Sequence, residues 1–226
     1  MLALKLGLSL VSIRPQGGWS PDDESSLVAW YQNKVGITLN GSDVSGWTDS
    51  APAGLYDMVQ ADATEQPAYS AGVLTFVSAD RQNLQTSGQI SLTGDFTLGL
   101  RINTSTTNGA FLADNTSANE FFKYSSVSRI LFKIAASTST ILDLDSGTFG
   151  DDYIVITRVS NVVTLWKNGV AQTGTTPTVA GTSLIDVIGL RRTDLNPFEG
   201  TIKEIQIYSS SSTELTANIN DRLSTL

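Results

Sequence analysis

The sequence contains no cysteine and no histidine. The absence of cysteine excludes disulfides, thiolate metal ligands and a cysteine nucleophile. The absence of histidine removes the usual general base near neutral pH and the commonest ligand of transition metals. Catalytic sites of the serine–histidine–aspartate and cysteine–histidine types are therefore excluded.

Basic residues are scarce as well. The chain has 14 Lys and Arg against 22 Asp and Glu, which gives a formal net charge of −8. A surface that binds nucleic acid needs clustered basic side chains to displace counterions, and Arg191-Arg192 is the one basic doublet. No apolar run reaches the length that spans a bilayer. We therefore expect neither nucleic acid nor membrane among the partners.

Serine, threonine, glycine and valine are plentiful instead, and this composition favours strands and turns. The 226 residues suffice for one large all-β domain. The strongest local pattern, residues 153–174, predicts a three-stranded meander with tight turns at Ser160-Asn161 and Asn168-Gly169. The alternation of apolar and polar residues in 201–208 shifts by one position near Lys203-Glu204, which predicts a bulge. In all, we expect strands at 27–31, 73–77, 96–102, 129–135, 153–159, 162–167, 184–190 and 201–208.

One helix is predicted at the C-terminus. Ser211 followed by Glu214 has the spacing of a capping box. The apolar residues that follow recur at helical spacing and form one stripe, which we expect to pack on the protein's own domain. These residues are Leu215, Ile219, Leu223 and Leu226.

The N-terminal segment carries leucine at every second position. This alternation predicts a strand with one apolar face. The alternative is a secretory signal, but Lys5 interrupts the apolar run and no small-residue cleavage site follows. The stretch 15–21 is rich in glycine and proline and predicts a hinge. We therefore divide the chain into an arm, 1–21, and a β-sandwich, 22–226, and expect the arm either to pack on its own sandwich or to anchor the domain to a neighbouring subunit. The candidate anchor residues are Leu2, Leu4, Leu6, Leu8 and Leu10.

YIVITRVSNVVTLWKNGVAQTG (153–174) resembles a hairpin of concanavalin A-like domains of the laminin-G and pentraxin type, and FEGTIKEIQIYSSSSTELTANI (198–219) is similar to the closing segment of the same group. LVAWYQNKVGITLNGSDVSGWTDS (27–50) and QPAYSAGVLTF (66–76) resemble the opening of such domains in bacteriophage virion proteins. The resemblance implies an all-β fold, a two-sheet antiparallel jelly-roll sandwich, here with an N-terminal strand arm and one short C-terminal helix.

The phage-type opening implies a function. It suggests a non-enzymatic structural component of a virion, such as a head decoration, a head fibre or a tail accessory protein. Its partners would then be other virion proteins, namely capsid or tail subunits or further copies of the same chain in a homo-oligomer. The alternative is a carbohydrate-binding module that recognises a host surface glycan, because fold alone does not decide function.

Glycoside hydrolases of this fold class carry carboxylates at alternate strand positions. The nearest pattern here is Asp143 and Asp145, and the third position falls among residues 146–148, which are Ser, Gly and Thr. A retaining hydrolase needs two carboxyl groups flanking the sugar, about 5–5.5 Å apart. Because this pattern is broken, we expect no enzymatic activity and no catalytic residues.

Many domains of this group bind calcium through oxygen ligands. Asp151 and Asp152 are the candidate Ca²⁺ ligands, and the alternative is that they are plain solvated acids. No other cofactor is expected.

Aromatic side chains are the usual platforms for sugars. We take Trp47, Tyr56 and Asp57 as the candidate glycan-binding residues. The alternative for Trp47 is that its W-x-D motif with Asp49 reports packing against the sheet. Two further tryptophans, Trp30 and Trp166, lie inside strand patterns and are predicted to be core residues.

Overall fold

The computed structural model of the protein describes residues 18–116, 120–135, 138–145, 147–192 and 195–226. The predicted leucine strand, with Leu2, Leu4, Leu6, Leu8 and Leu10, lies outside the described residues. Its role therefore stays a prediction.

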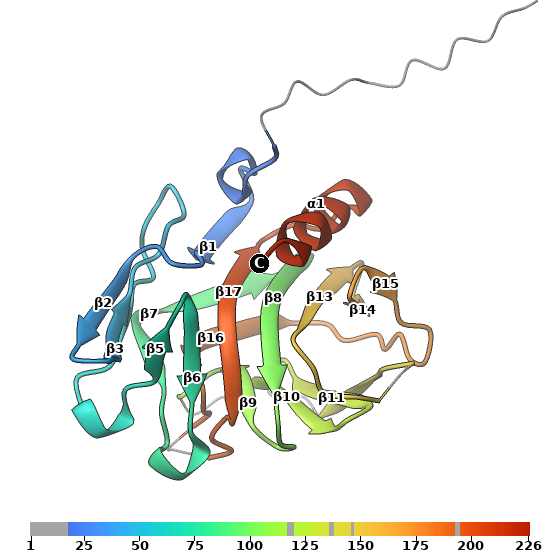
Figure 1. Ribbon diagram of the computed structural model, residues 1–226. Helices are drawn as coiled ribbons and strands as arrows, with labels where there is room; N and C mark the ends of the chain where they lie inside the picture. Colours follow the sequence, from blue (N-terminus) through green and yellow to red (C-terminus); the bar gives the residue numbers. More distant parts are fainter. Residues whose placement is uncertain (1–17, 117–119, 136–137, 146, 193–194) are drawn as a thin grey trace, which may run out of the picture.

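The first of two antiparallel layers is built around the long strands β17, β8 and β13 (Figure 1). Each strand pairs with the next in a continuous ladder, and strand β1 closes one edge. In spatial order the strands are β1 (Leu27–Tyr31), β17 (Gly200–Tyr208), β8 (Phe96–Thr104), β13 (Asp152–Val159), β14 (Val162–Lys167) and β15 (Val170–Ala171).

The second layer has β7, β16, β9 and β10 at its centre. A corner of short strands joins it to the first layer, because β6 pairs with β17 and β3 pairs with β4. In spatial order the layer contains β4 (Met58–Val59), β7 (Leu84–Thr93), β16 (Thr182–Ile188), β9 (Ala110–Ala113), β10 (Phe121–Ser126), β11 (Arg129–Lys133) and β12 (Thr140–Asp143). The corner contains β2 (Ile37–Asn40), β3 (Asp43–Trp47), β5 (Ala68–Ser70) and β6 (Val73–Phe76), and three 3₁₀ turns lie at η1 (Pro21–Asp23), η2 (Ala63–Glu65) and η3 (Ser78–Asp80).

The core lies between the two layers. Side chains alternate faces along a strand, so every second residue of β8 and of β13 points inward. Phe96 of β8 meets Phe122 of β10 nearly edge-on, with ring centroids 6.5 Å apart, and Phe122 stacks on Phe132 of β11 at 5.7 Å. The Phe96–Phe122 contact joins the two layers face to face, which confirms the predicted antiparallel sandwich.

The meander and the bulge are confirmed. Ser160 and Asn161 both have positive φ, 50° and 69°, and so do Asn168 and Gly169, at 52° and 78°. These are the backbone conformations that two-residue hairpin turns need. The register of β17 against β8 shifts between Ile202 and Glu204, at the predicted position.

Helix α1 (Thr213–Ser224) lies on the outer face of the first layer (Figure 1). Its N-cap is Ser212, whose hydroxyl accepts from the Leu215 N–H, so the predicted capping box of Ser211 and Glu214 is wrong. The residue three places after the true cap is leucine, which cannot return the bond. The apolar stripe does pack on the domain, as predicted, against Val155 and Tyr208. No helix in the described part of the chain has the length and apolarity needed to cross a bilayer.

A glycine permits this close packing. A Cβ atom on Gly99 of β8 would lie 2.5 Å from Cγ2 of Ile219, which is closer than two carbon atoms can approach. The absence of a side chain at Gly99 therefore allows α1 to sit directly on the sheet.

The described end of the predicted hinge is folded. The Trp19 indole N–H donates to Glu24 at 3.0 Å, and Ser20 forms a capping box with Asp23 around η1. Trp19 also packs on the apolar cluster beneath α1. The folded domain therefore begins before Asp22, because the tryptophan ring finds an apolar surface to cover.

Candidate functional site

The structure places the predicted glycan residue Trp47 in the core. Its side chain is 0% exposed, its ring lies 5.6 Å from that of Tyr31, and its indole N–H donates to the carbonyls of Gln32 and Val35. A ring with no exposed face cannot stack on a sugar, so the assignment of Trp47 as a glycan platform is wrong. Tyr56 is half-buried and Asp57 is exposed, and their role stays a prediction.

Asp49 explains the W-x-D motif. One oxygen of its buried carboxylate accepts from the backbone N–H groups of Trp30 and Ala51, both at 2.9 Å, and the other accepts from that of Tyr56 at 3.3 Å. Asp57 in turn accepts from the Asp49 N–H at 2.8 Å. The motif therefore fixes the loop after β3 against β1, and the packing alternative is confirmed.

The candidate calcium ligands are occupied by basic side chains. Asp151 accepts from the guanidinium of Arg101 and pairs with the Lys203 amine at 2.8 Å. Asp152 pairs with the Lys167 amine at 3.1 Å and accepts from the Asn168 amide at 2.8 Å. Cations this close repel a metal ion, so the structure corrects the Ca²⁺ prediction at this pair.

The pKa of Asp151 reflects this pairing. Partial burial raises the pKa, but the hydrogen bonds and charges of Arg101 and Lys203 outweigh burial and hold it below its ordinary value. Within the described ranges, no group of three or more acidic side chains is placed to hold a metal ion.

The two carboxylates of the hydrolase-like pattern have separate structural partners. Asp143, at the end of β12, accepts from Arg129 at 2.8 Å. Asp145 accepts from the Thr173 N–H at 3.1 Å and also bonds its hydroxyl. The side chain of Thr175 bonds the backbone of β12 on the same side. Asp143 and Asp145 thus help to hold the 173–175 segment along the edge strand β12.

The outer face of the second layer carries a different ionisable cluster. Burial lowers the pKa of Lys123, and the nearby Arg191 lowers it further. Both cations lie over the ring of Phe121, at 5.4 and 4.4 Å from its centroid. Burial raises the pKa of Asp186, whose carboxylate accepts from the Asn115 N–H at 2.7 Å. These contacts hold loops against the sheet, and we assign them to the architecture of this face.

A groove runs between helix α1 and strand β14 on the outer face of the first layer. Trp166 and Thr164 of β14 and Tyr153 and Thr157 of β13 point to this side, because residues two apart share a face. Val155, between Tyr153 and Thr157 in this set, is fully buried beneath the helix. The strands beyond the helix are therefore left partly open, with a tryptophan at the boundary.

Two adjoining clefts form this groove. The first, of about 230 Å³, lies between Tyr153 and Trp166 on one side and the helix residues Asn220 and Asp221 on the other. The second, of about 290 Å³, continues past Trp166 towards the start of the helix. The clefts share Trp166, Thr213 and Thr216. Trp166 thus forms part of the wall of both.

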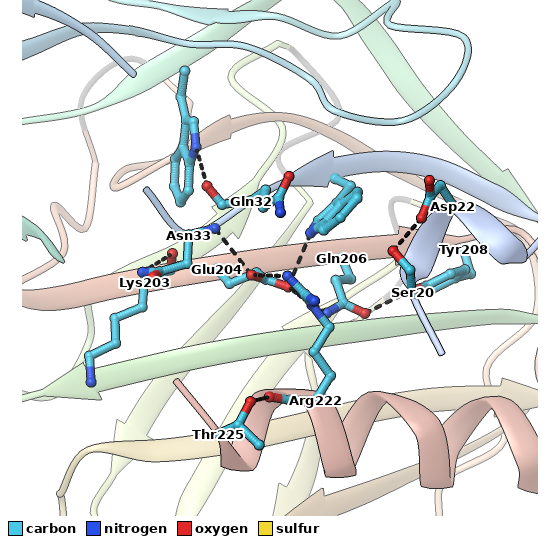
Figure 2. A network of polar contacts seen from close by, with 12 residues as sticks. Ser20, Asp22, Gln32, Asn33, Lys203, Glu204, Gln206, Tyr208, Arg222 and Thr225 are labelled. Carbon is cyan, nitrogen blue, oxygen red and sulfur yellow. Dashed lines mark hydrogen bonds and ion pairs between the residues drawn. The ribbon is translucent and has the colours of Figure 1, made fainter. Parts of the chain in front are cut away.

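A larger cleft, of about 380 Å³, lies on the opposite side of α1, between the helix and Gly18-Trp19. Two of its polar side chains are already engaged, because Trp19 donates to Glu24 and Arg222 is bound to the buried Glu204, and Asp221 lines this cleft as well as the first one. Figure 2 shows Arg222 pointing away from the helix into the network around Glu204 and Gln206. The groove beside Trp166 is therefore the better candidate binding site.

The sequence-based prediction that Trp166 is a core residue is wrong. Trp166 is half-buried on the outer face, whereas Trp30 is buried as predicted. The signal was present in β14, because Trp166 shares the parity of Thr164, and the buried Val163 and Leu165 have the opposite parity. A polar residue two positions from a tryptophan indicates the outer face.

Comparison with solved structures confirms the fold. A sialidase of Trypanosoma rangeli in complex with sialic acid superposes with a TM-score of 0.58 at 13% identity, covering 93% of this chain and 35% of the sialidase chain. This protein is thus similar to about a third of the sialidase, in a jelly-roll sandwich of the concanavalin A-like kind. A heptameric SAP-like pentraxin of Limulus polyphemus has a TM-score of 0.47 at 14% identity, covering 61% of this chain and 73% of the pentraxin. The CBM40 domain of a Ruminococcus gnavus IT-sialidase, bound to α2,6 sialyllactose, has a TM-score of 0.44 at 12% identity, covering 57% of this chain and 84% of the CBM40 chain.

Sequence comparison adds nothing to this. No protein-family model matches the chain, and no curated protein matches it. At identities this low the likeness shows the fold alone, and function has to be argued from the site.

Proposed function

We propose that this protein is a non-enzymatic carbohydrate-binding module that holds a host surface glycan in the groove between α1 and β14. The observation that carries the proposal is Trp166, a half-buried indole in the shared wall of two adjoining clefts. A pyranose ring has an apolar face that stacks on an aromatic ring and a rim of hydroxyl groups that needs polar partners. Hydroxyl and amide side chains of α1 supply such partners along the opposite wall.

Binding without cleavage fits the polar groups around the groove. Asp221 is the one carboxylate among its lining residues in the described part of the chain, so the groove offers no pair of carboxylates to flank a glycosidic bond. Asp143 and Asp145 lie on other strands and have structural partners.

The test is glycan-array binding of the full chain and two matched variants. We expect Trp166→Ala to lower affinity roughly 10- to 30-fold, as loss of a central aromatic anchor does. Tyr56→Ala, at the corner formed by β2 to β6, should leave binding unchanged. Trp166→Phe, which keeps an aromatic face, should retain part of the affinity, and the thermal unfolding midpoint of each variant controls for folding.

The opposite pattern would overturn the assignment of the groove. If Tyr56→Ala abolishes binding and Trp166→Ala does not, the glycan site lies at the corner with Tyr56 and Asp57. If no glycan is bound by the intact chain, the proposed function itself fails.

A second candidate function is that of a structural component of a bacteriophage virion, either a head decoration, a head fibre or a tail accessory protein. It is supported by the resemblance of residues 27–50 to the opening of domains in phage virion proteins and by the alternating leucines of the arm. The two functions are compatible, since a virion protein can carry a glycan-binding module. The partners would be capsid or tail subunits, or further copies of this chain.

A truncated chain that begins at Gly18 tests the second candidate. It keeps every contact of Trp19 and η1 described above, so we expect its unfolding midpoint to match that of the full chain. If the arm is the anchor, particles should no longer incorporate the truncated protein, and any homo-oligomer seen by light scattering should dissociate. A lower midpoint with unchanged incorporation would show instead that the arm belongs to its own domain.

A further inference from the structure

The polar lining of the groove is rich in acceptors. The Thr216 hydroxyl donates to the Ser212 carbonyl at 2.9 Å, and the Ser224 hydroxyl donates to the Asp221 carbonyl at 2.7 Å. Each hydroxyl has thus used its one proton inside the helix and keeps free lone pairs on its oxygen. These two hydroxyls can therefore accept hydrogen bonds from a ligand but not donate them, while the Trp166 indole N–H and the Tyr153 hydroxyl are donors of the same lining.

Asn220 strengthens this bias. It lines the first cleft and is 7% exposed, and its amide nitrogen donates to the Thr216 carbonyl at 2.9 Å. Its amide oxygen has no hydrogen-bond partner within the described residues. A buried acceptor without a partner is costly, and because this oxygen has less than 1 Å² of accessible area, a ligand donor reaches it only when the Asn220 side chain rotates towards the cleft.

The charge of the groove points the same way. Asp221 is exposed and contributes a carboxylate to the first cleft, and no Lys or Arg lines either cleft in the part of the chain that the structure describes. The chain as a whole carries a net charge of −8. A carboxylate, sulfate or phosphate on a ligand brings only hydrogen-bond acceptors, which cannot bond the acceptor oxygens of the groove. Its negative charge would also be repelled by the Asp221 carboxylate.

The dimensions indicate a chain of sugars. The outer-facing residues of β13 run from Tyr153 to Val159, which at ~3.3 Å per residue is roughly 20 Å. The helical wall from Thr213 to Ser224 is roughly 17 Å long at 1.5 Å per residue. Trp166 lies between the two clefts, so sugar rings have room on both sides of it.

From these observations we infer that the groove takes a linear, uncharged oligosaccharide, stacks one ring on Trp166 and excludes acidic sugars. The inference rests on the proposed function and specifies its ligand class. Donor hydroxyls of the ligand bond the Asp221 carboxylate and, once its side chain rotates, the Asn220 amide oxygen; both residues line the first cleft together with Trp166.

The experiment is calorimetric titration of the full chain with size series of soluble β-1,4-linked oligosaccharides, from monosaccharide to hexasaccharide. The neutral series are built of glucose, mannose or N-acetylglucosamine, and the acidic series is built of mannuronic acid, which differs from the mannose series in its carboxylate. We expect at least one neutral series to bind, with an affinity that rises with chain length and then levels off. The same lengths of the acidic series should bind at least about tenfold more weakly at low salt, where Asp221 repels them most strongly.

Asp221→Lys is the decisive variant. Asp221 is exposed in the last turn of α1, where a cation suits the helix dipole, so the variant should fold. It should raise affinity for the mannuronic acid series by about tenfold at low salt, and the gain should fade as salt rises. Asp80→Lys, on the exposed 3₁₀ turn η3 outside the groove, makes the same change in net charge and should leave the preference unchanged.

The outcomes separate the two proposals. If the wild-type chain binds the acidic series more tightly than every neutral series, or if Asp80→Lys changes the preference as much as Asp221→Lys does, the inference on ligand class is wrong and glycan binding stands. If affinity does not rise beyond the monosaccharide, the linear-chain part is wrong. If neither these series nor the glycan array gives any binding, the proposed function fails.

Discussion

Replacing Arg158 with methionine is expected to lower the free energy of unfolding by about 4 kcal/mol, because three buried carbonyl oxygens lose their donor. Arg158 is 0% exposed at the end of β13. Its guanidinium donates to the carbonyls of Gly94 at 2.6 Å, Gly181 at 2.7 Å and Leu92 at 3.1 Å. It therefore ties the β7–β8 turn and the start of β16 to the first layer.

The surroundings of Arg158 make the loss hard to repair. The guanidinium carbon lies 4.7 Å from the centroid of the Phe96 ring, so the charge is stabilised by an aromatic face as well as by dipoles. Burial lowers the pKa of Arg158, and the charges of Asp95 and Glu120 oppose that effect. Methionine replaces the aliphatic stem of arginine but lacks the guanidinium, so it donates no hydrogen bond.

Denaturant unfolding at neutral pH measures the effect. Arg129→Met is the matched control, because Arg129 is 47% exposed on its side chain and makes one ion pair, with Asp143. Exposed pairs contribute about 1 kcal/mol or less. Arg158→Lys should recover about half of the loss, since a lysine amine is charged but cannot reach three carbonyls in a plane. Equal losses for Arg158→Met and Arg129→Met would contradict this role of Arg158.

Long strands with clear alternation could be predicted from the sequence. β13, β14 and β17 each place one apolar face on a core, and a period of two is visible without knowledge of the partner strand. β7 was missed because its buried residues, Leu84, Ile90 and Leu92, are interrupted by a run of polar residues and a glycine. The register of β7 against β16 shifts in that run, and β7 is one strand because it pairs with β16 on both sides of the shift.

The candidate site was harder to predict for a different reason. Trp47 and Trp166 both lie in or beside strands, and their exposure depends on what covers them. Tyr31 and the carbonyls after β1 bury Trp47, whereas helix α1 stops short of Trp166. The burial of the unpaired Asn220 amide oxygen depends on where the helix rests on the sheet. The parity of β14 does place Trp166 on the outer face, but how far α1 covers that face is not encoded in a local pattern.

The second large effect is expected at Glu204, which joins β17, β1 and α1 (Figure 2). Its carboxylate is fully buried. The donors around it are the Arg222 guanidinium at 2.5 and 2.9 Å, the Trp30 indole at 3.0 Å, the Asn33 N–H at 3.1 Å and the Gln206 amide at 2.7 Å. Tyr208 donates to Gln206 at 2.8 Å, and burial raises the pKa of Tyr208, so its hydroxyl keeps the proton.

Glu204→Leu should lower the free energy of unfolding by about 4 kcal/mol, because removing one partner of a buried ion pair leaves the other uncompensated. Arg222, 21% exposed on its side chain, would keep its position over the Trp30 ring at 4.8 Å but lose its counter-charge. Asp151→Ala is the control: it removes a 45% exposed carboxylate that pairs with Arg101 and Lys203, and it should cost about 1 kcal/mol or less.

The double variant Glu204→Leu/Arg222→Met decides whether the pair acts as a unit. Each single change strands a charge at the interface between β17 and α1, whereas the double change removes both charges and leaves apolar side chains facing each other. The loss in the double variant should therefore be smaller than the sum of the single losses by about 2 kcal/mol. Additive losses would show that Glu204 stabilises the domain through Trp30, Asn33 and Gln206 and not through the helix. In that case Arg222→Met alone should also leave α1 docked, which hydrogen exchange of the helix amides would reveal.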